Sequence, residues 1–270
     1  MSSLTDRGYD HRITLARVVR SEWTKLSSLL STWLVFGGMA LLAVCLAGVF
    51  GYGHGQQIRN GEIAPSTADA VSVALLPMDL LALVVAIFGV LQMSGEYGSG
   101  LMRATLAAVP RRLPVLWAKA VVLAALTGVV MLVVCVGSLM LSQGLAGSDD
   151  ASLGDPTVLR AICGAAFSVA MTALVGLGIG SMLRHTAGSI TVLVVVLLIV
   201  PPLMGAVPRE EVRDAIEPYL PTLAGQAIYQ VGESSSTFET FSPGMSAVVL
   251  AGWALLSLAG GGAVLYRRDA

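Results

Sequence analysis

The chain has 270 residues, of which 55% are hydrophobic and 12% are charged, and its formal net charge is −1. Soluble domains carry about 25% charged residues, so this composition does not fit a soluble domain and indicates lipid as the main solvent. The few basic residues give no support to nucleic-acid binding, and the absence of period-two alternation argues against a membrane β-barrel. We therefore predict an all-α polytopic membrane protein.

An amphipathic helix is predicted over residues 12–30, before the first long apolar run. Apolar side chains such as Trp23 and Leu26 recur there every three or four positions, and charged residues such as Glu22 and Lys25 occupy the rest of the helix. Trp and Lys suit a helix that lies in the headgroup layer of a membrane. The alternative is a helix packed on the body of the protein.

Six apolar runs are each long enough to cross a bilayer core of about 30 Å, which takes roughly 20 helical residues. The six expected spans cover residues 32–50, 71–93, 115–142, 158–182, 189–207 and 244–266. Pro201 and Pro202 should break or kink the fifth span. Gly176 and Gly180 form a GxxxG pattern in the fourth span, which we interpret as close packing within the chain in preference to a dimer seam.

Basic residues are distributed unevenly over the two sides of this arrangement. With both termini on one side, that side holds 12 of the 16 Lys and Arg residues: Arg7, Arg12, Arg17, Arg20, Lys25, Arg103, Arg111, Arg112, Lys119, Arg184, Arg267 and Arg268. The positive-inside rule then predicts that both termini and residues 94–119 are cytoplasmic. The connection over residues 208–243 is expected to be external and to form one or two short helices.

The sequence lacks the common catalytic motifs. It contains no GxxxxGK[ST] phosphate-binding loop, no HExxH and no GxSxG. His11, His54 and His185 lie in separate polar regions, so we expect no metal site. We predict a chain that is not an enzyme and binds no cofactor of its own.

Asp79 is the one acidic residue inside a predicted span. A carboxylate in mid-membrane costs about 2.5–3.5 kcal/mol on insertion scales, so it normally has a partner or a function. The second span starts on the outer side, and we therefore interpret Asp79 chiefly as reaching the outer interface. A substrate or proton site is the alternative.

Residues 94–119, between the second and third spans, are the most informative part of the sequence. They are too few to bury a core of their own. They follow the order acid, glycine turn, short helix over residues 101–108, Pro-Arg-Arg and Lys. Glu96 has four basic residues available as partners, namely Arg103, Arg111, Arg112 and Lys119. We interpret this segment as a docking element, and the alternative is a plain loop whose arginines only satisfy topology.

This segment contains, in order, Ser94-Gly95-Glu96-Tyr97, Gly100, Arg103, Leu106, Pro110-Arg111-Arg112 and Lys119. In that order the residues resemble the cytoplasmic signature of ATP-binding-cassette (ABC) type-2 permeases. Residues 20–26 are similar to the amphipathic entry helix of that family. Residues 218–227 are similar to its external re-entrant segment. The resemblance covers essentially the whole chain, with Gly98 as a departure, because many relatives have a basic or polar residue there.

The resemblance implies a single permease domain over residues 1–270, in the plasma (inner) membrane. Two permease chains, identical or related, would pair with two ATPase subunits that hold ATP and Mg and drive outward movement of a hydrophobic or amphipathic substrate. The coupling region would comprise Glu96, Tyr97, Gly100, Arg103, Pro110 and Arg111. Two alternatives remain: a secondary transporter or channel that uses Asp79, and a non-transporting membrane anchor or immunity protein.

Overall fold

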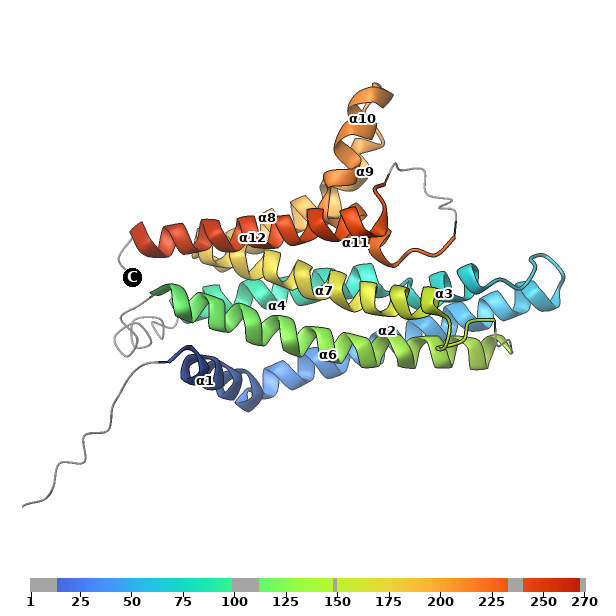
Figure 1. Cartoon of the computed structure of the whole chain (residues 1–270), viewed down its shortest axis with the longest axis horizontal. Helices are drawn as coiled ribbons and strands as arrows, with labels where there is room; N and C mark the ends of the chain where they lie inside the picture. The colour runs from blue at the N-terminus through green and yellow to red at the C-terminus, as the bar shows by residue number, and fades with distance from the viewer. Residues whose placement is uncertain (1–13, 99–111, 148–149, 233–239, 268–270) are drawn as a thin grey trace, which may run out of the picture.

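The computed structural model describes residues 14–98, 112–147, 150–232 and 240–267. Within these ranges the chain is helical and has no β-strand, and six segments are long and apolar enough to cross a membrane. The long helices run side by side along the long axis of the molecule (Figure 1). The prediction of an all-α fold with six candidate spans is therefore confirmed. The short helix expected over residues 101–108 lies outside the described residues.

The helices fall into a long and a short group. The long ones are α2 (Leu30–Arg59), α4 (Met78–Gly98), α6 (Arg112–Ala146), α7 (Pro156–Leu183) and α12 (Pro243–Arg267). The short ones are α1 (Leu15–Ser28), α3 (Thr67–Leu75), α8 (Thr186–Val194), α9 (Val200–Met204), α10 (Glu210–Ile216) and α11 (Pro221–Tyr229). A π-helical turn joins α8 to α9, and a 3₁₀ turn joins α10 to α11.

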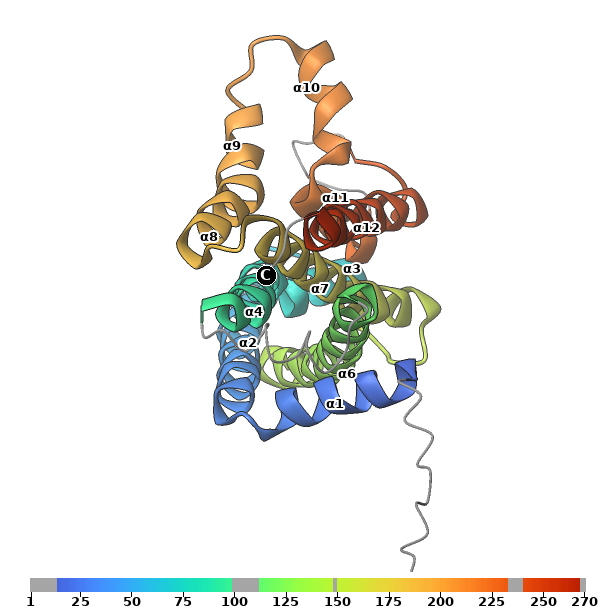
Figure 2. The ribbon, with the colours of Figure 1, turned by 90° about the vertical axis from the view of Figure 1, so that its left-hand side faces the viewer.

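Helix α7 lies in the middle of the bundle, between α4, α6 and α12 (Figure 2). Its glycines allow the neighbouring backbones to approach closely. A Cβ atom on Gly176 would collide with the carbonyl of Ala86 on α4, and one on Gly178 would collide with Ser257 on α12. The interpretation of the glycine pattern as packing within the chain is confirmed.

The second candidate span consists of two helices. Helix α3 ends at Leu75 and α4 begins at Met78, with Pro77 between them. Proline has no backbone N–H and disfavours helical geometry in the residue before it, which explains the break. The candidate span Thr67–Gly98 contains the predicted residues 71–93, and it is interrupted at Pro77. The break places Asp79 in the first turn of α4.

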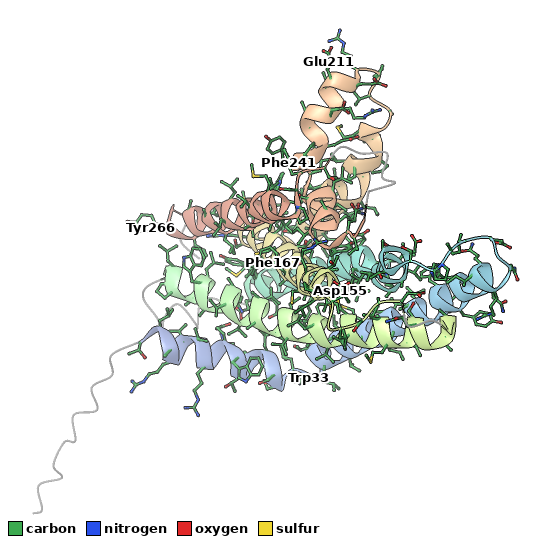
Figure 3. The ribbon with its side chains drawn as sticks, turned by 45° about the vertical axis from the view of Figure 1, so that its right-hand side comes forward. Trp33, Asp155, Phe167, Glu211, Phe241 and Tyr266 are labelled. Atoms are coloured by element: carbon green, nitrogen blue, oxygen red, sulfur yellow. The ribbon has the colours of Figure 1, made fainter. Side chains whose placement is uncertain are left out.

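The fifth candidate span contains a π-helical turn immediately before α9, which holds Pro201 and Pro202, where the sequence predicts a break or kink. Because Pro201 has no N–H, the carbonyl of Leu197 lacks its usual helical donor, and the hydroxyl of Thr222 on α11 donates to it at 2.8 Å. Beyond this point α9 and α10 project away from the other helices, with Glu211 near the tip of the projection (Figures 1 and 3).

Helix α1 crosses one end of the bundle beside α2 and α6 (Figure 2), and we call this the α1 end. The structure has a helix in this region, as predicted, but it does not place Glu22 on the polar side of that helix. The buried residues are Val18, Glu22 and Leu26, whereas Trp23 is exposed. A spacing of four residues places Val18, Glu22 and Leu26 on one face, so Glu22 points into the protein and not to its polar surface.

Candidate functional site

Four charged side chains meet at the α1 end. Glu22 and Lys25 come from α1, Glu96 comes from the last turn of α4, and Lys119 comes from α6. We call these four residues the ion cluster. Glu22 belongs to it because α1 packs through its Val18–Leu26 face, and Glu96 belongs to it because α4 ends beside the first turns of α6.

Lys119 is the inner member of the ion cluster, and its Nζ atom bridges the two carboxylates. It lies 2.8 Å from Oε2 of Glu22 and 2.9 Å from Oε1 of Glu96. The Nζ atom of Lys25 lies 2.6 Å from Oε1 of Glu22 and 3.7 Å from Oε1 of Glu96. The side chain of Lys119 is 2% exposed and that of Lys25 is 32% exposed. Two ammonium groups of the ion cluster therefore compensate its two carboxylates. The contacts of Lys119 are buried, and those of Lys25 lie nearer the surface.

Glu22 stays ionised inside this cluster. Burial by itself raises the pKa of a carboxyl group, because it penalises the charged form. The positive charge of Lys119, the hydrogen bonds from Lys119 and Lys25 and the charge of Lys25 together outweigh burial, and they lower the pKa of Glu22 below its ordinary value of 4.5. The cluster is thus fully charged at neutral pH on its Glu22 side.

The last turn of α4 also contacts the turn between α7 and α8. The guanidinium carbon of Arg184 lies 4.9 Å from the ring centroid of Tyr97, which is a cation–π distance. Arg184 also donates to the carbonyl of Val264 on α12 at 3.2 Å, and Thr186 donates to the hydroxyl of Ser94 at 3.0 Å. The end of α4 is therefore tied to α1, to α6 and to the α7–α8 turn.

The residues that the sequence singles out for coupling fall into two groups. Glu96 pairs with Lys119, one of its four predicted partners, and Tyr97 stacks against Arg184. The remaining four, Gly100, Arg103, Pro110 and Arg111, lie outside the described residues. The sequence analysis missed Glu22, and the spacing of four that joins it to Val18 and Leu26 is the signal that could have revealed it.

Asp79 occupies a second polar site, on the side of the bundle where α11 packs. Its Oδ1 atom accepts a hydrogen bond from the hydroxyl of Tyr229 at 2.8 Å, and its Oδ2 atom accepts one from Nε2 of Gln226 at 2.7 Å. Both donors are neutral and both come from α11. Over the ranges that the structure describes, no Lys, Arg or His forms an ion pair with Asp79.

Helix α11 is held against its neighbours by further hydrogen bonds. Arg160 of α7 donates to the carbonyls of Ile228 and Gln230, at 2.9 and 2.8 Å. Trp253 of α12 donates to the carbonyl of Tyr219 at 2.8 Å, just before α11 begins. With the bond from Thr222 to the carbonyl of Leu197, these contacts fix α11 relative to α7, α12 and the π-helical turn.

Beside Asp79 lies a cavity of about 220 Å³, between α4, α7, α11 and the π-helical turn. It opens on the surface of the molecule and is mostly apolar. Its lining residues, which we call the Asp79 pocket, are Asp79, Leu80, Ala82, Leu83, Ser168, Thr172, Leu197, Leu198, Pro221, Thr222 and Gly225. The hydroxyl of Thr172 is used within α7, where it donates to the carbonyl of Ser168. Asp79 is therefore the one ionisable group among the lining residues.

No protein-family model matches the chain, and no curated protein matches it in sequence. Among the described residues, no group of three or more His, Cys, Asp or Glu side chains could hold a metal ion. The functional assignment therefore rests on the ion cluster and on the Asp79 pocket.

Proposed function

We propose that this chain is the permease subunit of a type-2 ABC exporter, in which a separate ATPase subunit hydrolyses ATP. The observation that carries the proposal is the fastening of the last turn of α4. Glu96 and Tyr97 link that turn to α1, α6 and the α7–α8 turn, immediately before the connection over residues 99–111. If an ATPase docks on this connection, its movement would be transmitted through the last turn of α4 to α1, α6 and the α7–α8 turn together. Coupling of ATP hydrolysis to transport requires such a transmission.

The orientation that belongs to this proposal puts both termini, α1 and residues 99–111 in the cytoplasm and α10 and α11 outside. The distribution of basic residues supports it. Val18 and Leu26 of helix α1 pack on the bundle, while the apolar side chain of Trp23, on another side of the helix, is exposed. A helix of this kind suits a place in the inner headgroup layer, with its outer apolar side chains in lipid.

The energy source in this proposal is a partner protein. Lys25 and Lys119 are the lysines of the chain, and both belong to the ion cluster. No lysine is therefore left for a phosphate-binding loop, which agrees with the absence of such a motif. Two ATPase subunits with their ATP and Mg, and a second permease chain that is identical or related, would complete the exporter.

The proposal predicts an ATPase gene beside the gene for this chain, and co-purification of that ATPase with the chain tests it. We expect Glu96→Ala to reduce the amount of ATPase that co-purifies, because it releases the last turn of α4 from Lys119. We expect the same of Arg111→Ala, because charged contacts at a protein interface typically cost several kcal/mol when one partner is removed. Asp79→Asn is the matched control and should leave docking unchanged. Measurable ATP binding by the purified chain alone, or ATPase docking that both alanine variants leave intact, would contradict the proposal.

The secondary-transporter alternative has one observation in its favour, the unpaired carboxylate of Asp79 beside a pocket. It predicts that the purified chain, reconstituted alone in liposomes, transports substrate down an ion gradient and that Asp79→Asn abolishes this activity. The exporter proposal predicts no transport under these conditions.

A further inference from the structure

The two carboxylate oxygens of Asp79 are only partly satisfied. An ionised carboxylate offers about four acceptor positions, and the structure fills two of them, with the hydroxyl of Tyr229 and the amide of Gln226. These donors are neutral, so they hold and orient the carboxylate without cancelling its charge. The described part of the chain thus leaves Asp79 without a counter-ion within ion-pairing distance.

The surroundings of Asp79 are apolar on the side of the pocket. Leu80 and Leu83 come from α4, and Leu197 and Leu198 come from the π-helical turn. Charged residues at membrane depth normally pair with an opposite charge or mark the path of a substrate or ion. A site that combines one fixed charge with apolar walls is selective for a ligand that has both features.

We propose that the Asp79 pocket binds the charged group of a hydrophobic organic cation, such as a quaternary ammonium compound with an aromatic or alkyl substituent. Asp79 is the counter-ion, and the leucine side chains contact the apolar substituent. The identification of this ligand as the exported substrate rests on the proposed exporter function. The binding itself does not.

An inorganic cation fits this pocket poorly. Hard cations such as Ca²⁺ take six to eight oxygen ligands, and a dehydrated ion here would find few besides Asp79. Besides Asp79, the side-chain oxygens of the lining are the three hydroxyls of Ser168, Thr172 and Thr222, and the rest of the lining is largely carbon. A quaternary ammonium group needs no such shell, because its charge is spread over alkyl groups that tolerate an apolar wall.

The size of the pocket limits what it can enclose. Its volume of about 220 Å³ lies below the roughly 300–1,000 Å³ that is typical of sites for drug-sized ligands. One ring with a compact cationic group matches this volume, and a longer substituent would extend through the open side. Because α11 is fastened by Arg160, Thr222 and Trp253, the carboxylate is held in place before a ligand arrives.

The test measures binding of radiolabelled benzyltrimethylammonium to the purified full chain in phosphatidylcholine nanodiscs, by equilibrium dialysis against empty nanodiscs. Phenylmethanesulfonate, a similar molecule with the opposite charge, is the ligand control. We expect saturable binding of the cation alone, and a loss of affinity of roughly tenfold or more in Asp79→Asn. Asp69→Asn is the protein control, because Asp69 is an exposed acid on α3 outside the pocket, and it should bind as the wild type does.

A second variant keeps the charge and removes the space. Ala82→Phe places a ring in the pocket while Asp79 stays, and it should abolish binding as well. This variant decides the question if Asp79→Asn fails to fold. Wild-type affinity in folded Asp79→Asn or in Ala82→Phe, or equal binding of phenylmethanesulfonate, would overturn the pocket proposal. Since no ATPase is present in this experiment, these outcomes leave the docking proposal untouched, and failure of ATPase docking leaves the binding result untouched.

Discussion

Helix α4 carries one acid near each end, and the two acids have opposite environments. Glu96 shares the ammonium group of Lys119 with Glu22, so its charge is compensated inside the protein. Among the described residues, Asp79 receives hydrogen bonds only from neutral donors of α11, and it lies beside an apolar pocket. Two acidic residues of one helix therefore have different roles. Where ammonium groups surround the carboxylate it joins helices, and where they are missing it is available to a ligand.

The largest effect on stability should come from removing Lys119, the cation that compensates Glu22 and Glu96. Lys119→Met leaves Glu22 and Glu96 close together, with the partly exposed Lys25 as the remaining cation of the ion cluster. Breaking a buried ion pair by deleting one partner typically costs about 3–5 kcal/mol, so we expect a large drop in thermal stability in detergent and poor accumulation in the membrane. Lys25→Met is the control and should lose much less, because Lys25 is 32% exposed. Equal losses in both variants would show that burial of the cluster is not the deciding factor.

Around α11, the largest loss of stability should come from substitution of Arg160, which holds α11 against α7, and not from substitution of Asp79. Arg160→Met removes two hydrogen bonds to the carbonyls of Ile228 and Gln230, and bonds that involve a charged group contribute about 1.5–3 kcal/mol each. We expect faster hydrogen exchange in α11 and lower thermal stability. Arg209→Met, at an exposed arginine beside α10, should change neither quantity. An unchanged exchange rate in α11 of the Arg160 variant would contradict this assignment.

A smaller effect is expected from the neutral donors of Asp79. Tyr229→Phe removes one hydrogen bond to a carboxylate and should cost about 1.5–3 kcal/mol of unfolding free energy, against two such bonds in Arg160→Met. Tyr219→Phe is the matched control, since the exposed Tyr219 contributes its backbone carbonyl and its ring to the packing, both of which phenylalanine keeps. Thermal unfolding of the two variants side by side measures the difference. If Tyr229→Phe lowered the unfolding free energy as much as Lys119→Met does, the charge of Asp79 would have to depend on the hydroxyl of Tyr229 for its stabilisation.

The smallest effect concerns mild acidification of the ion cluster. The pKa of Glu22 is lower in the folded protein than its ordinary value of 4.5, so its stabilising contribution is complete above that value and is lost as the pH falls through the folded-state pKa. Protease sensitivity of α1 should therefore stay constant from pH 7 to about pH 5 and rise only in stronger acid. In Glu22→Gln, the part of the acid-induced increase in protease sensitivity that comes from protonation of Glu22 should be absent. A rise already near pH 6 in the wild type would contradict the direction of the pKa shift.

Features that depend on long stretches of sequence were predictable, and features that depend on helix orientation were not. The six spans follow from apolar length, and the disruption of the fifth follows from Pro201 and Pro202. The pairing of Glu96 with Lys119 was one of four options that charge alone allowed. Glu22 was misplaced because hydropathy assigns a glutamate to the polar face, whereas the helix buries it to reach a lysine that lies 97 positions further along the chain.

The surroundings of Asp79 could not be derived from the sequence for a related reason. Its donors, Gln226 and Tyr229, lie about 150 residues away, in a connection whose return to the bundle depends on Arg160, Thr222 and Trp253. Each of these contacts uses a backbone carbonyl as acceptor, and carbonyls leave no trace in a sequence. Pro77 explains the break before α4, but a proline causes an interruption without determining which partner the next turn meets.

The glycines of α7 also determine which parts of the molecule can move independently. Where helices meet through side chains, rotamer changes allow small sliding movements. The backbone of α7 directly contacts those of α4 and α12, so no side chains lie between them that could change rotamer. These three helices therefore behave as one rigid body. With 28 residues rising about 1.5 Å each, α7 is about 42 Å long, so a tilt imposed beside Tyr97 displaces the surroundings of Asp79 at once. Any opening of the pocket relative to this body has to come from the outer elements, α8 with its π-helical turn on one side and α11 on the other.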